Sequence, residues 1–122
     1  MYFEKVSYDI WKEAWNNTDI PEEQIQSWYN ELKLPKQGTK HSAGMDFFAP
    51  YSMKILPNNS IIIPTGIRWV TDIHNKDKVL MIMPRSGMGF KYGVRLSNTT
   101  AVIDADYCEA ENMGHILIKL YN

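Results

Sequence analysis

The sequence predicts an all-β sandwich or barrel preceded by a helical segment. From Pro35 onward, short runs of β-branched and apolar residues alternate with turn-forming residues, and no helical period persists. Before that point, apolar residues recur at three- and four-residue spacing instead. The length of 122 residues and a hydrophobic content of 44% suit one compact unit. We therefore expect a helical extension over residues 1–34 and a β domain over residues 35–122.

The N-terminal segment is predicted to form two helices. Thr18 or Asp19, shortly before Pro21 and two glutamates, is typical of a helix start. We expect the tryptophans to dock this helical pair on the β domain rather than to bind a ligand. The apolar residues at helical spacing are Tyr8, Trp11 and Trp15 in the first helix and Ile25, Trp28, Tyr29 and Leu32 in the second.

Five runs in the second part of the chain have the composition of β-strands. Turn-forming sequences such as PNNS, HNKDK and ENMG separate them. Pro64 lies inside the second run, where it predicts a bend or an edge position because proline cannot donate a ladder hydrogen bond. The runs are SMKIL at 52–56, SIIIPTGIRWV at 60–70, KVLMIMP at 78–84, GVRLSNTTAVI at 93–103 and GHILIKL at 114–120.

Composition excludes several classes of function. A net charge of -1 gives no overall field that would attract duplex nucleic acid or an anionic membrane. Cys108 is the only cysteine, so no internal disulfide or multi-cysteine zinc site can form, and a reducing cytoplasm is the expected location. The three histidines are too scattered for a metal-ligand spacing. Neither a signal peptide nor a membrane span is indicated.

The stretch PRSGMGFKYGV at 84–94 is the first candidate for binding chemistry. A glycine-rich turn exposes backbone N–H groups, which form a concavity that suits an anion. Arg85 adds a charged fork and Ser86 a hydroxyl, and both suit phosphate oxygens. Taken alone, the stretch is better interpreted as an ordinary turn.

The stretch NTTAVIDADY at 98–107 is the second candidate. Asp104 follows an apolar run that should be buried, so we expect it where a strand surfaces into a hairpin. A partly shielded carboxylate there can take a proton from water as a general base. Tyr107 offers a flat apolar face with a polar tip for a sugar or base. Taken alone, a turn-initiating pair of aspartates with a core tyrosine is the better interpretation.

The stretch GTKHSAGMDFFAP at 38–50 is the third candidate. Its small residues allow the backbone to approach a ligand, and Asp46 interrupts an otherwise apolar strand entry. On its own it predicts only a turn. Together, SAGMDFF, PRSGMGFKYGV and NTTAVIDADY, in this order between short strands, resemble the first three motifs of the trimeric dUTPase family. The resemblance runs from Leu34 to the end, and the N-terminal part resembles members from Gram-positive bacteria and their phages.

This resemblance implies a jelly-roll (β-clip) subunit in a homotrimer, with active sites between subunits that convert dUTP to dUMP and pyrophosphate. It implies that the triphosphate is bound by one motif and the uracil edge by another, partly through backbone atoms. The residues carried over are Arg85, Ser86 and Gly87 for the triphosphate, and Asn98, Val102, Ile103 and Leu117 for the uracil.

The resemblance also assigns the remaining roles. Tyr107 matches the residue that packs under the deoxyribose and leaves no room for a 2′-hydroxyl. Asp104 matches the base that activates the water attacking the α-phosphorus. The implied cofactor is Mg²⁺ chelated by the substrate phosphates, with no direct protein ligand. Asp46 is expected to support the water shell of this ion.

Three features depart from the family pattern. Ala101 stands where glycine is usual, and six residues, Cys108 to Met113, separate Tyr107 from Gly114 where most members have one. The sequence stops at Asn122, before the later family motifs, so we expect a C-terminally truncated member with weak turnover. The alternatives are a non-catalytic nucleotide-binding or regulatory protein and, less expected, a relative of the dCTP deaminases.

Overall fold

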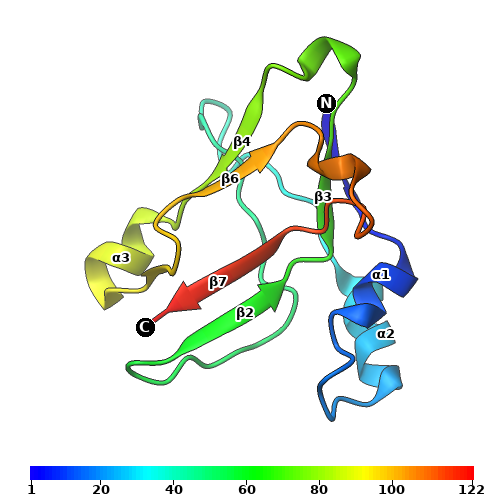
Figure 1. The fold of residues 1–122 in the computed structure, drawn as a ribbon. Helices are drawn as coiled ribbons and strands as arrows, with labels where there is room; N and C mark the ends of the chain where they lie inside the picture. The colour runs from blue at the N-terminus through cyan, green and yellow to red at the C-terminus, as the bar shows by residue number, and fades with distance from the viewer.

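The computed structural model describes residues 1–122, and it confirms the predicted all-β class: seven short strands form three antiparallel sheets (Figure 1). The strands are β1 (Tyr2–Lys5), β2 (Ser60–Pro64), β3 (Ile67–Val70), β4 (Val79–Ile82), β5 (Arg95–Leu96), β6 (Ala101–Asp104) and β7 (Leu117–Tyr121). The helices are α1 (Tyr8–Glu13), α2 (Glu22–Glu31) and α3 (Ser86–Tyr92), with 3-10 turns η1 (Ile73–Asn75) and η2 (Tyr107–Glu109). None of the helices is long and apolar enough to span a bilayer.

The sheets have the strand orders β2-β7-β5, β4-β6 and β1-β3. Strands β6 and β7 follow one another in the chain, yet they belong to different sheets and lie apart (Figure 1). Helices α1 and α2 lie together at one end of the molecule, while α3 projects from the far side of the sheets.

Several strand predictions are corrected by the structure. The run SMKIL at 52–56 is not a strand: it pairs with none of the three sheets, although Met53 and Ile55 pack against the core. The run at 60–70 is split into β2 and β3 at Thr65–Gly66, and Pro64 ends β2, which agrees with the predicted bend. Strand β1 was not expected, and it pairs with β3.

Two hydrophobic clusters hold the fold together. The larger one lies between the sheets and is centred on Ile116, which is fully buried. The smaller one is aromatic and lies beneath α1 and α2. In it, Trp11 is fully buried and its indole Nε1 donates to the Ile25 carbonyl at 2.9 Å. Trp28 stacks on Tyr51, which follows the extension, with ring centroids 4.8 Å apart. The tryptophans therefore dock the helices, as the sequence predicts.

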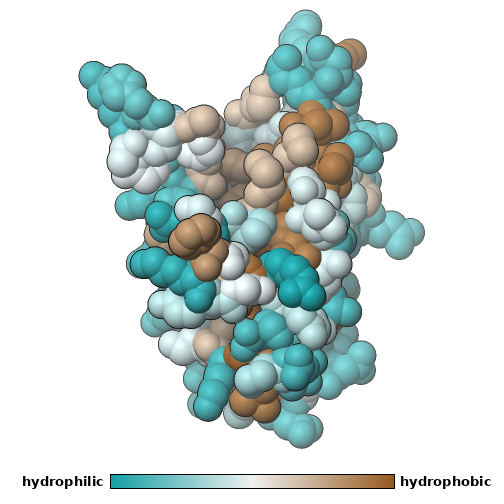
Figure 2. Space-filling view, turned by 90° about the vertical axis from the view of Figure 1, so that its left-hand side faces the viewer, coloured by the Kyte–Doolittle hydropathy of each residue, from teal (hydrophilic) through white to brown (hydrophobic).

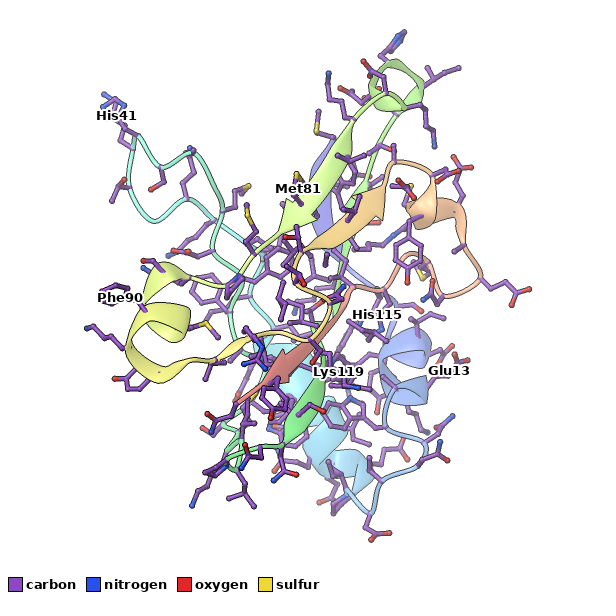
Figure 3. All side chains as sticks on the ribbon, turned by 60° about the vertical axis from the view of Figure 1, so that its left-hand side comes forward. Glu13, His41, Met81, Phe90, His115 and Lys119 are labelled. Carbon is purple, nitrogen blue, oxygen red and sulfur yellow. The ribbon has the colours of Figure 1, made fainter.

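His115 lies at the junction of the helical extension and the sheets (Figure 3). It is 3% exposed, and its Nε2 accepts a hydrogen bond from the Gly66 N–H at 2.9 Å. The Trp11 ring packs nearby, with the ring centroids 6.4 Å apart. Burial lowers the pKa of His115 from 6.5 to about 4. The imidazole is therefore neutral in the folded protein at neutral pH.

The burial of His115 predicts a loss of stability on acidification. The unfolded chain takes up a proton below about pH 6.5, whereas the folded chain does so only near pH 4. Stability should fall as the pH drops through this window, by about 2 kcal/mol at pH 5, and then level off for this group. Urea unfolding at pH 7 and pH 5 measures the effect. His115→Gln keeps an acceptor for Gly66 and should flatten the dependence, whereas His41→Gln should not; equal slopes in all three proteins would refute the assignment.

Candidate functional site

A pocket of about 310 Å³ lies between the start of β6 and β7. Its volume is at the lower end of the range for small-molecule sites, and a mostly apolar wall with a few polar groups is typical of them. Two residues predicted to contact the base, Asn98 and Leu117, line it together, although 19 positions separate them. Ala101 lines it as well. The full lining is Leu96, Ser97, Asn98, Ala101, Leu117, Ile118 and Lys119.

The pocket exists because the chain changes sheets between β5 and β6. Leu96 pairs with Leu120 of β7, and the next residue, Ser97, donates its N–H to the Lys119 carbonyl at 2.9 Å. Only four residues later, Ala101 pairs with Ile82 of β4. Strands β6 and β7 therefore do not form the paired hairpin that the sequence suggested. The edge of β7 at Leu117 has no strand partner on the pocket side, so its backbone groups there are free to bind a ligand.

A strained turn holds Asn98 at the mouth of this pocket. The N–H of Thr100 donates to the Asn98 carbonyl at 2.7 Å, which places Thr99 at the centre of a three-residue turn with a φ of 67°. Positive φ is unfavourable for a β-branched residue. The Asn98 side chain makes no hydrogen bond within the chain, so its amide is available to a ligand.

The glycine-rich stretch at 84–94 is a helix, which corrects the predicted turn. Arg85 is the N-cap of α3, Ser86 is its first residue, and Gly93 ends it in the left-handed conformation with a φ of 67°. The first N–H groups of a helix have no partner inside it. A Cβ at Gly87 would meet no atom within 4 Å, so the surrounding space is open. Arg85, Ser86 and Gly87 are thus adjacent and accessible, as a phosphate-binding role requires.

The structure brings the first and third candidate stretches together. Asp46 is held by an isolated β-bridge with Lys36, in which the Asp46 N–H donates to the Lys36 carbonyl at 2.8 Å. Its Oδ1 lies 3.8 Å from the Arg85 Nε. The Arg85 side chain is 78% exposed, so this is a loose contact that leaves the guanidinium free to bind an anion.

Asp104 lies at the other end of the β4–β6 ladder. It pairs with Val79, whereas Arg85 follows β4 beyond Ile82, which pairs with Ala101. Three residues of strand alone separate Ala101 from Asp104 by about 10 Å. A single chain therefore does not bring Asp104 and Arg85 together. Along β6, Val102 and Asp104 are exposed, while Ala101 and Ile103 are partly buried and face the core.

Tyr107 is fixed by the loop that follows it. Its hydroxyl donates to the His115 carbonyl at 3.1 Å and accepts from the Asn112 Nδ2 at 2.9 Å. The Asn112 Oδ1 in turn accepts from the Gly114 N–H at 3.0 Å. Sequence reasoning missed Asn112. The only available signal was its position in the six-residue segment that distinguishes this chain from the family pattern.

A wider open depression of about 690 Å³ lies at the start of α2, remote from all the motif residues. It is lined by Pro21, Glu22, Glu23 and Gln26, with no hydrophobic residue among them. A shallow, acidic surface lacks the apolar walls of a typical ligand site. The pocket between β6 and β7 is therefore the candidate functional site.

The fold places the protein in the class of small antiparallel β-structures. Its loops carry the loose Asp46–Arg85 pair, its strand β6 ends in the exposed Asp104, and a narrow pocket lies between β6 and β7. The family model described as dUTPase matches residues 30–122. The chain belongs to the dUTPase family.

Individual relatives agree with this assignment. A protein named "Deoxyuridine 5'-triphosphate nucleotidohydrolase" from Blochmanniella floridana is 40% identical over 101 residues, which cover 80% of this chain and 62% of the relative. One of the same name from Hydrogenovibrio crunogenus is 38% identical over 96 residues, which cover 75% of this chain and 57% of the relative. The chain thus spans about three-fifths of the length of these relatives.

A solved structure extends the comparison to the whole fold. The structure titled "Crystal structure of dUTPase from Streptococcus mutans" is 27% identical with a TM-score of 0.66, and the match covers 100% of this chain and 79% of that one. The predicted dUTPase-like jelly-roll is therefore confirmed.

Proposed function

We propose that the protein hydrolyses dUTP to dUMP and pyrophosphate. The observation that carries this proposal is the pocket between β6 and β7, where Asn98 and Leu117 line one slot at the edge of a strand with free backbone groups. Family membership supports the reaction class. The roles below rest on the match of single residues to the family motifs and on their geometry.

Uracil is recognised in this proposal by its hydrogen-bonding edge. The Asn98 amide, which is unpaired within the chain, and the backbone at Val102, Ile103 and Leu117 supply donors and acceptors. Cytosine exchanges a donor for an acceptor at the same edge, which leaves buried polar groups unpaired at a cost of about 1–3 kcal/mol each. The methyl group of thymine would meet backbone. The site therefore selects uracil over both.

The deoxyribose packs on Tyr107, and the triphosphate lies on Arg85, Ser86 and the Gly87 backbone. Support for the second contact comes from the free Arg85 guanidinium and the open space above Gly87. A guanidinium fork with adjacent hydroxyl and N–H donors matches phosphate oxygens. Asp104 takes a proton from a water molecule as that water attacks the α-phosphorus, and pyrophosphate leaves.

Mg²⁺ is the cofactor in this proposal, carried by the substrate. No group of three or more His, Cys, Asp or Glu side chains is arranged to hold a metal ion. The carboxylate that lies beside the phosphate-binding Arg85 is that of Asp46. Mg²⁺ usually keeps several waters and binds through one or two carboxylates plus phosphates. Bound in this way, it would neutralise charge on the phosphates, and Asp46 would contact its water shell.

We infer that the active protein is a homotrimer with shared sites. Asp104 and Arg85 lie at opposite ends of one ladder. A second chain is therefore needed to bring the general base Asp104 and the phosphate-binding Arg85 to the same nucleotide. The outer face of β4 and β6 also exposes an apolar group, Val79, Met81 and Val102, each more than half exposed. Figure 2 shows hydrophobic surface between two hydrophilic projections, and Figure 3 places Met81 between the loop of His41 and η1. Sedimentation should give about three times 14.2 kDa.

We place the protein in the cytoplasm, which suits its buried, unpaired Cys108. We also propose that it is of the type found in Gram-positive bacteria and their phages; the match to the Streptococcus mutans structure, which includes the N-terminal helices, supports this.

The experiment is an assay of pyrophosphate release with dUTP, dCTP, dTTP and UTP. Release from dUTP alone is the expected result. Binding of dUTP without pyrophosphate would favour the alternative of a non-catalytic nucleotide-binding or regulatory protein. Ammonia released from dCTP would instead indicate a relative of the deaminases.

A further inference from the structure

The loop between η2 and β7 closes on itself through one side chain. Asn112 is half-buried, and its amide uses both ends: the Oδ1 accepts from the Gly114 N–H at 3.0 Å, and the Nδ2 donates to the Tyr107 hydroxyl at 2.9 Å. Because the Gly114 N–H can only donate, it fixes the orientation of the amide, so the Nδ2 must face Tyr107. The Asn112 amide therefore links the Gly114 backbone to the Tyr107 hydroxyl in a fixed orientation.

The phenol is fixed at a second point. Its proton goes to the His115 carbonyl at 3.1 Å, which leaves its oxygen to accept from Asn112. A tyrosine hydroxyl with one donated and one accepted bond cannot rotate or shift without losing one of them. The Tyr107 ring is therefore held in one orientation before any ligand binds.

The base of the loop is rigid as well. The Arg68 Nη2 donates to the Cys108 carbonyl at 2.7 Å, and the Arg68 Nη1 bonds Glu4 at 2.9 Å. Lys76 pairs with Glu109. These contacts anchor the start of the loop to β3 and to the segment after η1. The backbone next to Tyr107 is thus fixed, and Asn112 restricts the movement of the Tyr107 hydroxyl.

We propose that Asn112 is a positioning residue that sets the Tyr107 ring and thereby the discrimination between deoxyribose and ribose. This inference rests on the proposed function, in which Tyr107 packs under the sugar. If the Tyr107 ring excludes a 2′-hydroxyl by steric contact, a small shift of the ring would make room for that hydroxyl. The hydrogen bond from Asn112 opposes such a shift. Asn112 lies within the six-residue segment that lengthens the loop.

The test compares affinities for non-hydrolysable α,β-imido analogues of dUTP and UTP, together with thermal stability. Asn112→Ala should reduce the preference for the deoxy analogue about tenfold, which corresponds to about 1.4 kcal/mol. Asn112→Asp keeps an acceptor for the Gly114 N–H but has no donor for the phenol oxygen, whose own proton goes to the His115 carbonyl, so it should lose the preference as Asn112→Ala does. Glu111→Ala, a change at the exposed neighbour, should leave it unaltered. Binding analogues keep the test independent of turnover.

A double-mutant cycle separates positioning from general loosening. Tyr107→Phe removes the bond to Asn112 together with the bond to the His115 carbonyl, so adding Asn112→Ala to it should change the preference little further. A variant that melts at lower temperature but keeps the wild-type preference would overturn the inference, because Asn112 would then be merely structural. A wild-type protein that binds neither analogue would overturn the proposed function, and this inference with it.

Discussion

Asp104→Asn is expected to abolish hydrolysis of dUTP while nucleotide affinity stays within about twofold of wild type. The side chain is exposed at the end of β6 and makes no hydrogen bond within the chain, so an amide of the same shape fits without strain. The amide cannot accept the proton of the attacking water. General-base catalysis typically contributes about 10²–10⁴-fold in rate, and we expect a loss in that range. Pyrophosphate release gives the rate, and titration with the imido analogue gives the affinity.

The matched control is Asp106→Asn, a change of the same kind two residues away. Asp106 is exposed at the start of η2, outside the role proposed for Asp104, and its variant should retain most of the activity. If Asp104→Asn released pyrophosphate at the wild-type rate, Asp104 would have no part in activating water. If both variants lost activity equally, the effect would be one of local charge and not of a base.

Gly114→Ala is expected to have the largest effect on stability. Gly114 has a φ of 72°, and a Cβ there would lie 2.7 Å from the Tyr107 carbonyl oxygen and 2.8 Å from the Cys108 Cα. Both are backbone atoms, and the segment is tied down by Arg68, so no cheap movement relieves the clash. We expect a loss of about 3–5 kcal/mol in the free energy of unfolding. Chemical denaturation followed by tryptophan fluorescence measures it.

Gly44→Ala serves as the comparison for that variant. Its Cβ would meet no atom within 4 Å and its φ is not positive, so stability should stay within about 0.5 kcal/mol. A Gly114→Ala protein as stable as Gly44→Ala would show that the loop adapts. The conclusion that this loop holds the Tyr107 ring in one orientation would then be wrong.

Local sequence predicts the strands better than it predicts their partners. The runs that became β2, β4 and β7 carry β-branched residues that favour a strand wherever a partner exists. SMKIL has the same composition, but it pairs with no strand, and pairing is a property of the whole fold. In α3, two glycines suggested a turn, whereas the N-cap at Arg85 and the left-handed Gly93 define a helix. Glycine lowers helix propensity, but the Gly93 N–H caps the carbonyls of Gly89 and Met88, and Met88 packs against the core.

The candidate site was predicted from motif resemblance and not from local patterns. Asn98 with Leu117, and Asp46 with Arg85, meet only through the fold, and both meetings are seen in the structure. No local pattern indicated that Asp104 would lie away from Arg85, because that separation follows from which end of the β4–β6 ladder each residue occupies. Asn112 could not be predicted for a similar reason, because its two hydrogen bonds depend on the conformation of the loop.

A crystal structure with α,β-imido-dUTP and Mg²⁺ tests the central claim most directly. We expect uracil between β6 and β7, the Tyr107 ring against the sugar, and the carboxylate of one chain's Asp104 a single water away from the α-phosphorus held by another chain's Arg85. A nucleotide bound elsewhere, or an Asp104 turned away from the α-phosphate, would contradict the account.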